Sequence, residues 1–536
     1  MKRFPPEKIR NVALVGHGGS GKTTLAEALL HKAGAITRMG RVEDGTTVCD
    51  FDPEEQKRSL SLSLALAPFE WKDHKVNLID CPGYADFIGD VQAALRVADL
   101  AIFVVSAVEG VEVQTHAAWK IASSLGVPRM IFVNKLDRER ASFDRTLSEL
   151  REFFGAGIAP LEIPVGGESG LRGIADLLTD TAYLYDSGNV THGEVPDELA
   201  ELEHQVHDNL VEGIVVADDE LLERYLGGES ISVEELERTL ATGVAEATVF
   251  PVVVGSATTD VAVDRLADFI VEIGPAPTDR PAVPVTAGDT TVDVKVDPSG
   301  DPLAVVFKTI ADPYVGHISL FKVLSGTIRP DDHLWNTRSG TDERLHGLFT
   351  LRGKEQDQLE EVPAGDLAAV AKLSATATGD TLAPKGKPVT VEPIASPPPV
   401  LATAILARTQ ADEDKLANAL HRLQEEDPAL VIDRSEETHQ TILRGTGETH
   451  LQITLEKLAR KFGVDVDTED VRVPYRETIN ASATNVEGKH KKQSGGHGQF
   501  GDCHIRMEPL TRGSGIEFVD DIFGGAIPRN FIPAVE

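Results

Sequence analysis

The chain has 536 residues, of which 41% are hydrophobic and 26% are charged, a balance that is ordinary for a soluble protein of several domains. It contains no run of about 18 uninterrupted apolar residues, so the sequence offers no membrane span. The formal net charge of -34 argues against nucleic-acid binding by bulk electrostatics, so any contact with RNA must be local.

The N-terminus and the cysteines indicate where the protein works. The segment from Met1 to Glu7 begins basic, but no apolar signal-peptide region follows it, so secretion is not expected. Cys49, Cys81 and Cys503 lie far apart without CxxC spacing, which fits neither a disulfide framework nor a zinc site. We therefore expect a cytoplasmic protein without a membrane segment.

Short apolar runs alternate with helical patterns in the first part of the chain, and each run predicts a buried strand. Strands separated by helices imply a doubly wound parallel sheet. Between Asp137 and Phe250 the sequence is rich in Glu and Leu with helical spacing and is too long for a loop, which predicts an inserted subdomain. The predicted strands are Val12–Val15, Val76–Ile79, Leu100–Val105, Met130–Val133 and Val252–Val254.

The pattern changes after Gly274, where prolines end the first part. From Leu303 onward, alternating strands separated by turns predict an antiparallel β-barrel. After the stiff spacer Pro397–Pro399, the order strand, helix, two strands, helix, strand predicts a ferredoxin-like domain. Its second helix carries apolar residues as far as Phe462, and Gly463 suits the helix C-cap.

These patterns predict the fold class: a multi-domain α/β and α+β protein. The last part stops abruptly without a polar tail, so we expect it to be the start of a truncated α+β domain. The predicted parts are a nucleotide-binding domain at 1–137 and 251–280, an inserted subdomain at 138–250, a β-barrel at 281–395, a ferredoxin-like third domain at 400–474 and a partial fourth domain at 475–536.

The loop between the first strand and the helix Thr24–Leu30 satisfies the P-loop pattern G-x-x-x-x-G-K-[ST]. Its glycines let backbone N–H groups surround a β-phosphate, Lys22 reaches the β- and γ-phosphates, and the Thr23 hydroxyl ligates magnesium. A plain glycine turn is the alternative interpretation. The predicted nucleotide-binding residues here are Gly16, His17, Gly18, Gly19, Ser20, Gly21, Lys22, Thr23 and Thr24.

The tetrapeptide Asp80-Cys81-Pro82-Gly83 follows a predicted strand, and the carboxyl ends of strands are where such sheets bind ligands. We expect Asp80 to hold magnesium through water and the Gly83 N–H to meet the γ-phosphate, which makes this loop a nucleotide-sensitive switch. Taken alone, the tetrapeptide is more often an ordinary turn. Its place after a P-loop favours the switch.

Two further strand ends predict which base is bound. The Asp137 carboxylate would accept two hydrogen bonds from the guanine N1–H and 2-amino groups, which adenine does not offer. Lys135 covers the ring, Asn134 braces the loops, and the Ala257 N–H donates to guanine O6. Each motif alone could be surface decoration, whereas the set in this order predicts GTP or GDP as the ligand. The predicted base-binding residues are Asn134, Lys135, Asp137, Ser256 and Ala257.

The order of these motifs resembles elongation factor G, and the resemblance covers essentially the whole chain. It implies a translational GTPase that binds GTP and magnesium, acts as a monomer on ribosomal RNA and proteins, and hydrolyses GTP to GDP. The basic segment among the matches is a solvated surface loop in the alternative interpretation. The matching segments are the long insert, Asp312-Pro313-Tyr314-Val315-Gly316, Gly447-Glu448-Thr449-His450-Leu451, and the basic stretch from Val486 to Gly496.

The sequence departs from the family pattern at the hydrolytic centre. Tyr84 stands where the family has the histidine of switch II, and a phenol, with an unperturbed pKa of about 10, is no cation at neutral pH. Gly18 and Gly19 replace an apolar residue that helps screen the attacking water and an acidic residue that helps hold a cation. Ser61 keeps a switch I hydroxyl for magnesium, and Arg58 matches the family's arginine. These changes resemble the elongation factor G-like paralogue subgroup, with neutral drift in an ordinary factor as the alternative.

Two functional hypotheses follow. The first is an elongation factor G-like GTPase that acts in translocation or a related step, in which Tyr84 orients water and the ribosome supplies the missing electrostatics. The second is a GTP-binding, ribosome-associated regulator with little or no hydrolysis. Tetracycline-protection and peptide-release GTPases rank lower because of the match at Lys489 to Gly496, and Asp137 disfavours a P-loop metabolic kinase. The predicted catalytic residues are Tyr84, Gly83 and Lys22, and the predicted magnesium ligands are Thr23, Ser61 and Asp80.

Overall fold

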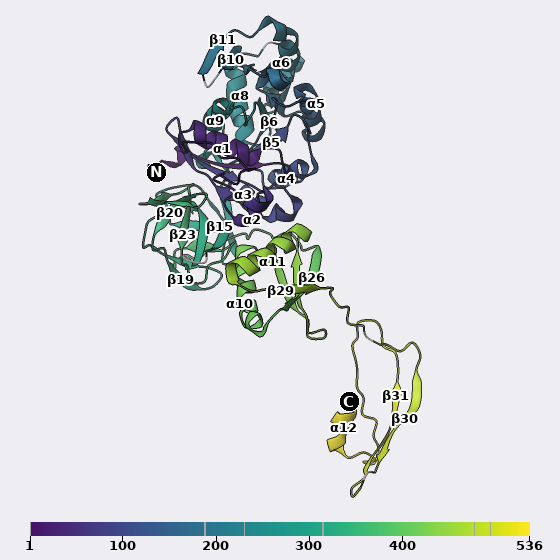
Figure 1. The fold of residues 1–536 in the computed structure, drawn as a ribbon. Coiled ribbons are helices and arrows are strands. Elements are labelled where there is room, and N and C mark those ends of the chain that lie inside the picture. Colours follow the sequence, from purple (N-terminus) through teal and green to yellow (C-terminus); the bar gives the residue numbers. More distant parts are fainter. Residues whose placement is uncertain (1, 187–188, 230, 313–315, 476, 494) are drawn as a thin grey trace. The chain divides into compact units, whose positions relative to one another are not determined.

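The computed structural model describes residues 2–186, 189–229, 231–312, 316–475, 477–493 and 495–536 (Figure 1). The chain forms two compact units, Met1–Ser435 with Gln440–Val471, and Glu436–His439 with Arg472–Glu536. Residues 313–315 and 494, which belong to two of the family-like motifs, lie outside the described residues.

A mostly parallel sheet forms the nucleotide-binding domain of the first unit. Its strands are β1 (Ile9–Val15), β2 (Ala65–Leu66), β3 (Phe69–Trp71), β4 (His74–Asp80), β5 (Leu100–Ser106), β6 (Arg129–Asn134), β7 (Ile158–Pro160) and β12 (Phe250–Val254). The order is β2-β4-β1-β5-β6-β12-β7, with β3 paired to β4. The central strands run parallel and every residue of β1, β5 and β6 is buried, as their apolar runs predict. All five predicted strands are confirmed.

Helices lie in the connections between these strands, as the doubly wound pattern requires. They are α1 (Lys22–Lys32), α2 (Pro53–Arg58), α3 (Ile88–Val97), α4 (Val113–Ser124), α5 (Phe143–Phe154) and α9 (Val263–Glu272). Helix α1 begins at Lys22, the lysine of the P-loop, and contains the predicted helix Thr24–Leu30. Its first residue follows Gly21, whose φ of 98° lies in the left-handed region that favours glycine. The P-loop is thereby placed at the carboxyl end of β1.

The inserted subdomain contains helices, as its spacing predicts, and also a sheet that the sequence pattern did not reveal. The helices are α6 (Ala200–Val215), α7 (Asp219–Leu226) and α8 (Val233–Ala245); the strands are β8 (Glu162–Val165), β9 (Gly173–Asp176), β10 (Thr181–Asp186) and β11 (Asn189–Gly193). The antiparallel order is β11-β10-β9-β8. Strands β8 and β9 have only four residues each, and β10 and β11 have few buried residues, so the sheet gives no long apolar run. Strand β7 lies within the predicted insert range but extends the main sheet through β12.

An antiparallel β domain follows, as predicted. Its strands are β13 (Val283–Ala287), β14 (Thr290–Val294), β15 (Leu303–Asp312), β16 (Gly316–Ser325), β17 (Thr327–Ile328), β18 (His333–Asn336), β19 (Thr341–Arg344), β20 (Leu348–Arg352), β21 (Glu355–Leu359), β22 (Val362–Pro363), β23 (Leu367–Ala371), β24 (Thr381–Ala383) and β25 (Thr390–Val391). The main sheet has the order β19-β18-β24-β15-β16-β23-β20-β21. Its core includes the fully buried side chains of Phe321, Leu348 and Val370.

The third domain has the predicted ferredoxin-like arrangement. Its elements are β26 (Leu401–Ala407), α10 (Gln410–Glu426), β27 (Val431–Arg434), β28 (Thr441–Gly445), α11 (Glu448–Phe462) and β29 (Val466–Glu469), and the sheet order is β27-β28-β26-β29. Leu416, Leu420 and Leu423 of α10 are buried in its core, as their spacing predicts. Helix α11 ends at Phe462, and Gly463 has a φ of 60°, which confirms the predicted C-cap.

The second unit contains a two-stranded antiparallel hairpin of β30 (Ala483–Lys492) and β31 (Gln499–Met507), with the short helix α12 (Ile532–Val535) near the end. The basic residues Lys489 to Lys492 therefore lie on a strand, rather than wholly in a loop, and they are exposed. The three cysteines, all among the described residues, are free. Among the residues that the structure describes, no helix is long and apolar enough to cross a membrane.

Candidate functional site

The P-loop backbone has the conformation that its glycines permit. Gly16, Gly19 and Gly21 have φ values of 138°, 82° and 98°, in the region that disfavours side chains. Lys22 is buried, and its ammonium donates to the carbonyl oxygens of Gly16 at 3.1 Å and His17 at 2.8 Å. Burial lowers the pKa of Lys22. The lysine therefore stands inside the loop, where the motif requires it for phosphate contacts.

The three predicted magnesium ligands come together beside the P-loop. The Thr23 hydroxyl donates to Asp80 Oδ2 at 2.7 Å and lies 3.0 Å from the Ser61 hydroxyl. Asp80 is at the end of β4, and Ser61 is in switch I, the segment that comprises α2 and the residues that follow it. Burial, together with the charge of the neighbouring Asp50, raises the pKa of Asp80 to about 7. A cation at this point would stabilise the ionised carboxylate.

Asp50 is a member of this cluster that the sequence motifs did not identify. Its side chain is 3% exposed, and burial raises its pKa, although the Ser61 hydroxyl and the Lys22 charge oppose that shift. Within the described part of the chain, Asp50 Oδ2 and Asp80 Oδ1 are buried oxygens without a hydrogen-bond partner. Two such oxygens beside two hydroxyls suit a hard divalent cation such as Mg²⁺. Asp50 follows no strand and belongs to no motif, so the sequence carries no signal for it.

Asn134 joins the P-loop to the loop after β12. Its amide nitrogen donates to the Ser20 carbonyl at 2.9 Å, and its side-chain oxygen accepts from the Ala257 N–H at 3.0 Å. This is the bracing that the sequence predicts. The Ala257 N–H, expected to donate to guanine O6, donates to Asn134 in this structure. Gly21 also needs to be a glycine here, because an added Cβ would lie 2.4 Å from the Asn134 amide nitrogen.

Asp137 is the carboxylate predicted to recognise the base. Its Oδ1 atom is buried and has no hydrogen-bond partner in the described ranges, while Oδ2 is 3.7 Å from Arg138 Nε. A buried acceptor without a donor is costly, and a ligand with paired N–H groups would satisfy it. Lys135 lies nearby with its ammonium 3.4 Å from Glu109 Oε2, and Ser256 is fully buried.

The remaining predicted residues border the same loop. His17 Nε2 lies 3.4 Å from Glu112 Oε1, and Thr24 is half-buried in the first turn of α1. Gly83 of switch II lies against the P-loop, because an added Cβ would be 2.4 Å from Lys22 Nζ. Tyr84 follows it with 48% of its surface exposed. The structure thus brings the predicted phosphate, metal and switch residues to one edge of the sheet.

Switch I is tied to the third domain by ion pairs. Arg460 of α11 donates twice to the Glu54 carboxylate, at 2.5 and 2.7 Å. One turn earlier, Glu456 lies 2.9 Å from Arg58 of α2. A two-pronged guanidinium–carboxylate contact holds its partner in a defined orientation. The sequence could not reveal these pairs, because about 400 residues separate the partners.

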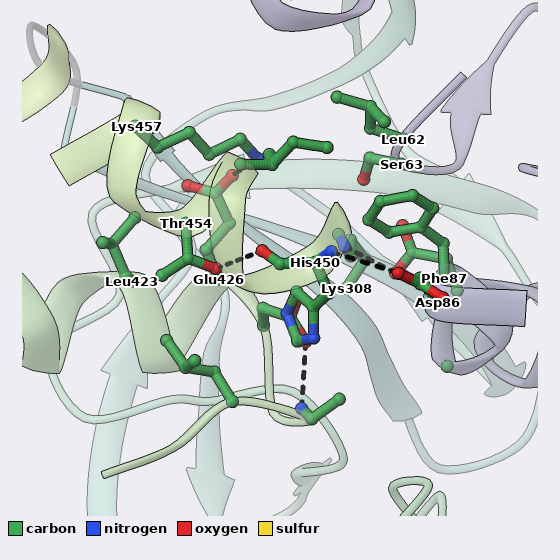
Figure 2. A pocket seen from close by; sticks show the side chains of 16 residues that line it. Leu62, Ser63, Asp86, Phe87, Lys308, Leu423, Glu426, His450, Thr454 and Lys457 are labelled. Atoms are coloured by element: carbon green, nitrogen blue, oxygen red, sulfur yellow. Dashed lines mark hydrogen bonds and ion pairs between the residues drawn. The ribbon is translucent and has the colours of Figure 1, made fainter. Parts of the chain in front are cut away.

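Switch II contacts the start of the same helix. The His450 N–H donates to the Asp86 carboxylate at 3.3 Å. Beside this bond, Leu62 of switch I, Phe87 of switch II and Ile453 of α11 form a small apolar cluster. Figure 2 shows the pocket that these residues border, with further walls from α10, α11 and β15. Both switches therefore meet the third domain around one pocket.

The fold and the nucleotide site define a P-loop GTPase of the multi-domain translation-factor class. Proteins named elongation factor G-like protein are 42% identical over 551 residues in Mycobacterium tuberculosis and 38% identical over 531 residues in Thermotoga maritima. In each case the match covers 99% of this chain and 76% of the relative. The chain belongs to the elongation factor G family, and these names confirm its likeness to the elongation factor G-like subgroup.

Matches to family models follow the order of the domains. A crystal structure from Thermus thermophilus is similar, with a TM-score of 0.84, 38% sequence identity, and coverage of 99% of this chain and 77% of that one. The matched models are the elongation factor Tu GTP binding domain at residues 7–276, elongation factor G domain 2 at 301–385, elongation factor G domain III at 396–470 and elongation factor G domain IV at 471–536.

Proposed function

We propose that this protein binds GTP with magnesium and hydrolyses it on the ribosome, in translocation or a related step. One observation carries the proposal: both switch segments contact the nucleotide loop and the third domain at once. Ser61 lies 3.0 Å from Thr23, and Arg58, three residues earlier, lies 2.9 Å from Glu456. A ligand that orders the switches therefore also changes the switch surface that contacts the third domain.

The proposed division of roles follows the sequence motifs. Residues of the P-loop from Gly16 to Thr24 hold the phosphates, and Asn134, Lys135, Asp137, Ser256 and Ala257 hold the base. Thr23, Ser61 and Asp80 would hold Mg²⁺, which neutralises charge on the phosphates when bound. The proposed domain boundaries are those given by the sequence patterns. We further propose that the protein acts as a monomer on ribosomal RNA and proteins.

Tyr84 is the proposed water-orienting residue, with Gly83 and Lys22 beside it. Its phenol can accept or donate a hydrogen bond to a water molecule, but it supplies no positive charge at neutral pH. Electrostatic stabilisation of the transition state commonly accounts for most of the rate enhancement in such reactions. We therefore propose that intrinsic hydrolysis is slow and that ribosome binding supplies the missing stabilisation.

The direct test is GTP turnover by the purified protein with and without ribosomes. The proposal expects weak intrinsic turnover and a large stimulation, of at least on the order of 10²-fold, because the missing electrostatics are worth several kcal/mol. An Asp137→Ala variant is the control for guanine-dependent binding. If GTP binds but ribosomes leave the rate unchanged, the hydrolytic part of the proposal is wrong.

A second candidate function is a ribosome-associated regulator for which GTP is a structural ligand. The observation that favours it is that Tyr84, at the position where the family has its histidine, is half-exposed. Tyr84→His separates the two proposals on ribosomes. A large gain in turnover favours the regulator, whereas a loss identifies the tyrosine as the working residue.

A further inference from the structure

Gly18 is a P-loop glycine whose own backbone does not require glycine. Its φ lies outside the left-handed region, unlike those of Gly16, Gly19 and Gly21. The space next to it is nevertheless closed. A Cβ at this position would have three ring atoms of Tyr84 as its nearest neighbours, with Cε2 at 2.7 Å and both Cδ2 and Cζ at 3.0 Å. Real side chains do not approach this closely, so any residue larger than glycine here displaces the ring.

The neighbouring glycine provides the contrast. At Gly19 the φ of 82° requires glycine, while an added Cβ would meet no atom of the described residues within 4 Å. Gly19 is thus needed for the backbone conformation, and Gly18 is needed to leave room for the tyrosine ring. The segment that carries Tyr84 also packs on the same stretch of P-loop, since a Cβ on Gly83 would lie 2.6 Å from Gly18 N and 2.7 Å from His17 C.

We infer that Gly18 is a positioning residue for Tyr84, and that the two departures from the family pattern act as one device. Because Gly18 has no side chain, the aromatic ring of Tyr84 packs directly against the P-loop. The apolar ring then screens the attacking water in place of the absent apolar side chain, and the Cζ carbon, which bears the hydroxyl, lies against the loop. This inference rests on the proposed hydrolytic function.

The functional consequence is tested by a double-mutant cycle of Gly18→Ala and Tyr84→Ala in the full chain. A methyl group at position 18 forces the ring to withdraw by roughly 0.7 Å, and misplacements of about 1 Å lower rates by on the order of 10²-fold. Single-turnover hydrolysis on ribosomes at saturating GTP should therefore fall at least about tenfold for Gly18→Ala when Tyr84 is present. In the Tyr84→Ala background the same change should cost clearly less, because no ring remains to be displaced. Equal losses in both backgrounds would overturn the pairing.

The position of the Tyr84 ring against Gly18 is tested separately by fluorine NMR with 3-fluorotyrosine at position 84. Gly18→Ala should move this resonance, whereas the control Gly167→Ala should not, because a Cβ at Gly167 would meet no atom of the described residues within 4 Å and its extended backbone does not require glycine. An unmoved resonance in Gly18→Ala contradicts the inference whatever the hydrolysis rates are. If ribosomes fail to stimulate the unaltered chain, the proposed function fails, and the NMR comparison alone then decides the pairing.

Discussion

Buried carboxylates without donors mark the nucleotide site at the scale of single residues. Asp137 Oδ1, Asp80 Oδ1 and Asp50 Oδ2 are all buried and have no hydrogen-bond partner in the described parts of the chain. Such oxygens cost free energy in the folded protein unless a ligand completes them. In our proposal a guanine base and a divalent cation are the ligands that complete them.

Glu162 of β8 is a buried carboxyl that contacts β12 just before the loop of Ser256 and Ala257. It accepts a hydrogen bond at 3.0 Å from the N–H of Val254, the last residue of β12. Arg265 is 3.9 Å away, and Asp176 and Asp264 add negative charge nearby. Burial raises the pKa of Glu162 to about 8, so the native carboxyl is mostly protonated at pH 7.

This carboxyl predicts a pH dependence of stability. Because the native pKa lies above the unfolded value, the native state binds more protons between about pH 4.5 and pH 8, and the free energy of unfolding falls as pH rises through that window. The slope contributed is at most about 1.4 kcal/mol per pH unit. Glu162→Gln should flatten the dependence and raise the urea midpoint at pH 8. An unchanged slope in this variant would contradict the assignment.

Residue identities were predictable wherever a motif fixes both chemistry and place. Lys22, Thr23, Asp80 and Asn134 stand where the motif order puts them, because each lies at or after the carboxyl end of a buried parallel strand. Asp50 could not be predicted, because its role comes from burial beside Asp80 rather than from its neighbours in the chain.

At the scale of elements, α11 of the third domain holds α2 of switch I. Besides its paired contact with Glu54, Arg460 lies 2.6 Å from Asp52, the residue that caps α2. Lys457 and Lys461, on the same helix, share the buried Glu426 of α10 at 2.9 and 2.8 Å. Since α2 has only six residues, its stability depends on such tertiary contacts.

Arg460→Ala should therefore loosen switch I without unfolding the protein. Hydrogen exchange of the amides from Asp52 to Ser63 should accelerate, and ribosome-stimulated turnover should fall, because the switch must be ordered for hydrolysis. Arg408→Ala is the matched control, since Arg408 makes an exposed ion pair with Asp467 in the same domain. Equal hydrogen-exchange rates in Arg460→Ala and Arg408→Ala would count against the role of Arg460 in holding α2.

At the scale of the whole first unit, buried ion pairs join the nucleotide-binding domain to the β domain. Lys75 of β4 donates to both oxygens of Asp366 at 2.8 Å, and Asn77 donates to the same carboxylate at 2.8 Å. Lys322 of β16 pairs with Asp99 at 2.8 Å. These charges are almost fully buried, so each depends on its partner.

Asp366→Ala should lower the free energy of unfolding by about 3–5 kcal/mol, because it leaves the Lys75 ammonium buried and unpaired. Urea unfolding followed by circular dichroism measures the loss. The double variant Lys75→Met, Asp366→Leu should recover much of it, since an apolar pair carries no desolvation penalty. Asp342→Ala, in an exposed pair with His333, serves as the control. If Asp366→Ala and Asp342→Ala had the same free energy of unfolding, the role of the buried pair would be refuted.

Periodic patterns made most of the fold predictable, and irregular or long-range features escaped. Strand Leu401–Ala407 and the end of α11 at Phe462 agree with their predicted limits because an apolar run and a C-cap glycine mark them. The sheet of β8 to β11 was missed because its strands are only four to six residues long and because β10 and β11 have few buried residues. Domain contacts such as Arg460 with Glu54 depend on packing between distant segments, which no local pattern encodes.

The most direct test of the account is a calorimetric titration of the chain with GDP and with ADP. A site built around Asp137 should prefer GDP by on the order of 10⁴-fold, because adenine leaves the buried carboxylate without donors. In Asp137→Ala the preference should largely disappear. Equal affinity for GDP and ADP in the unaltered chain, or no binding of either, would contradict the account.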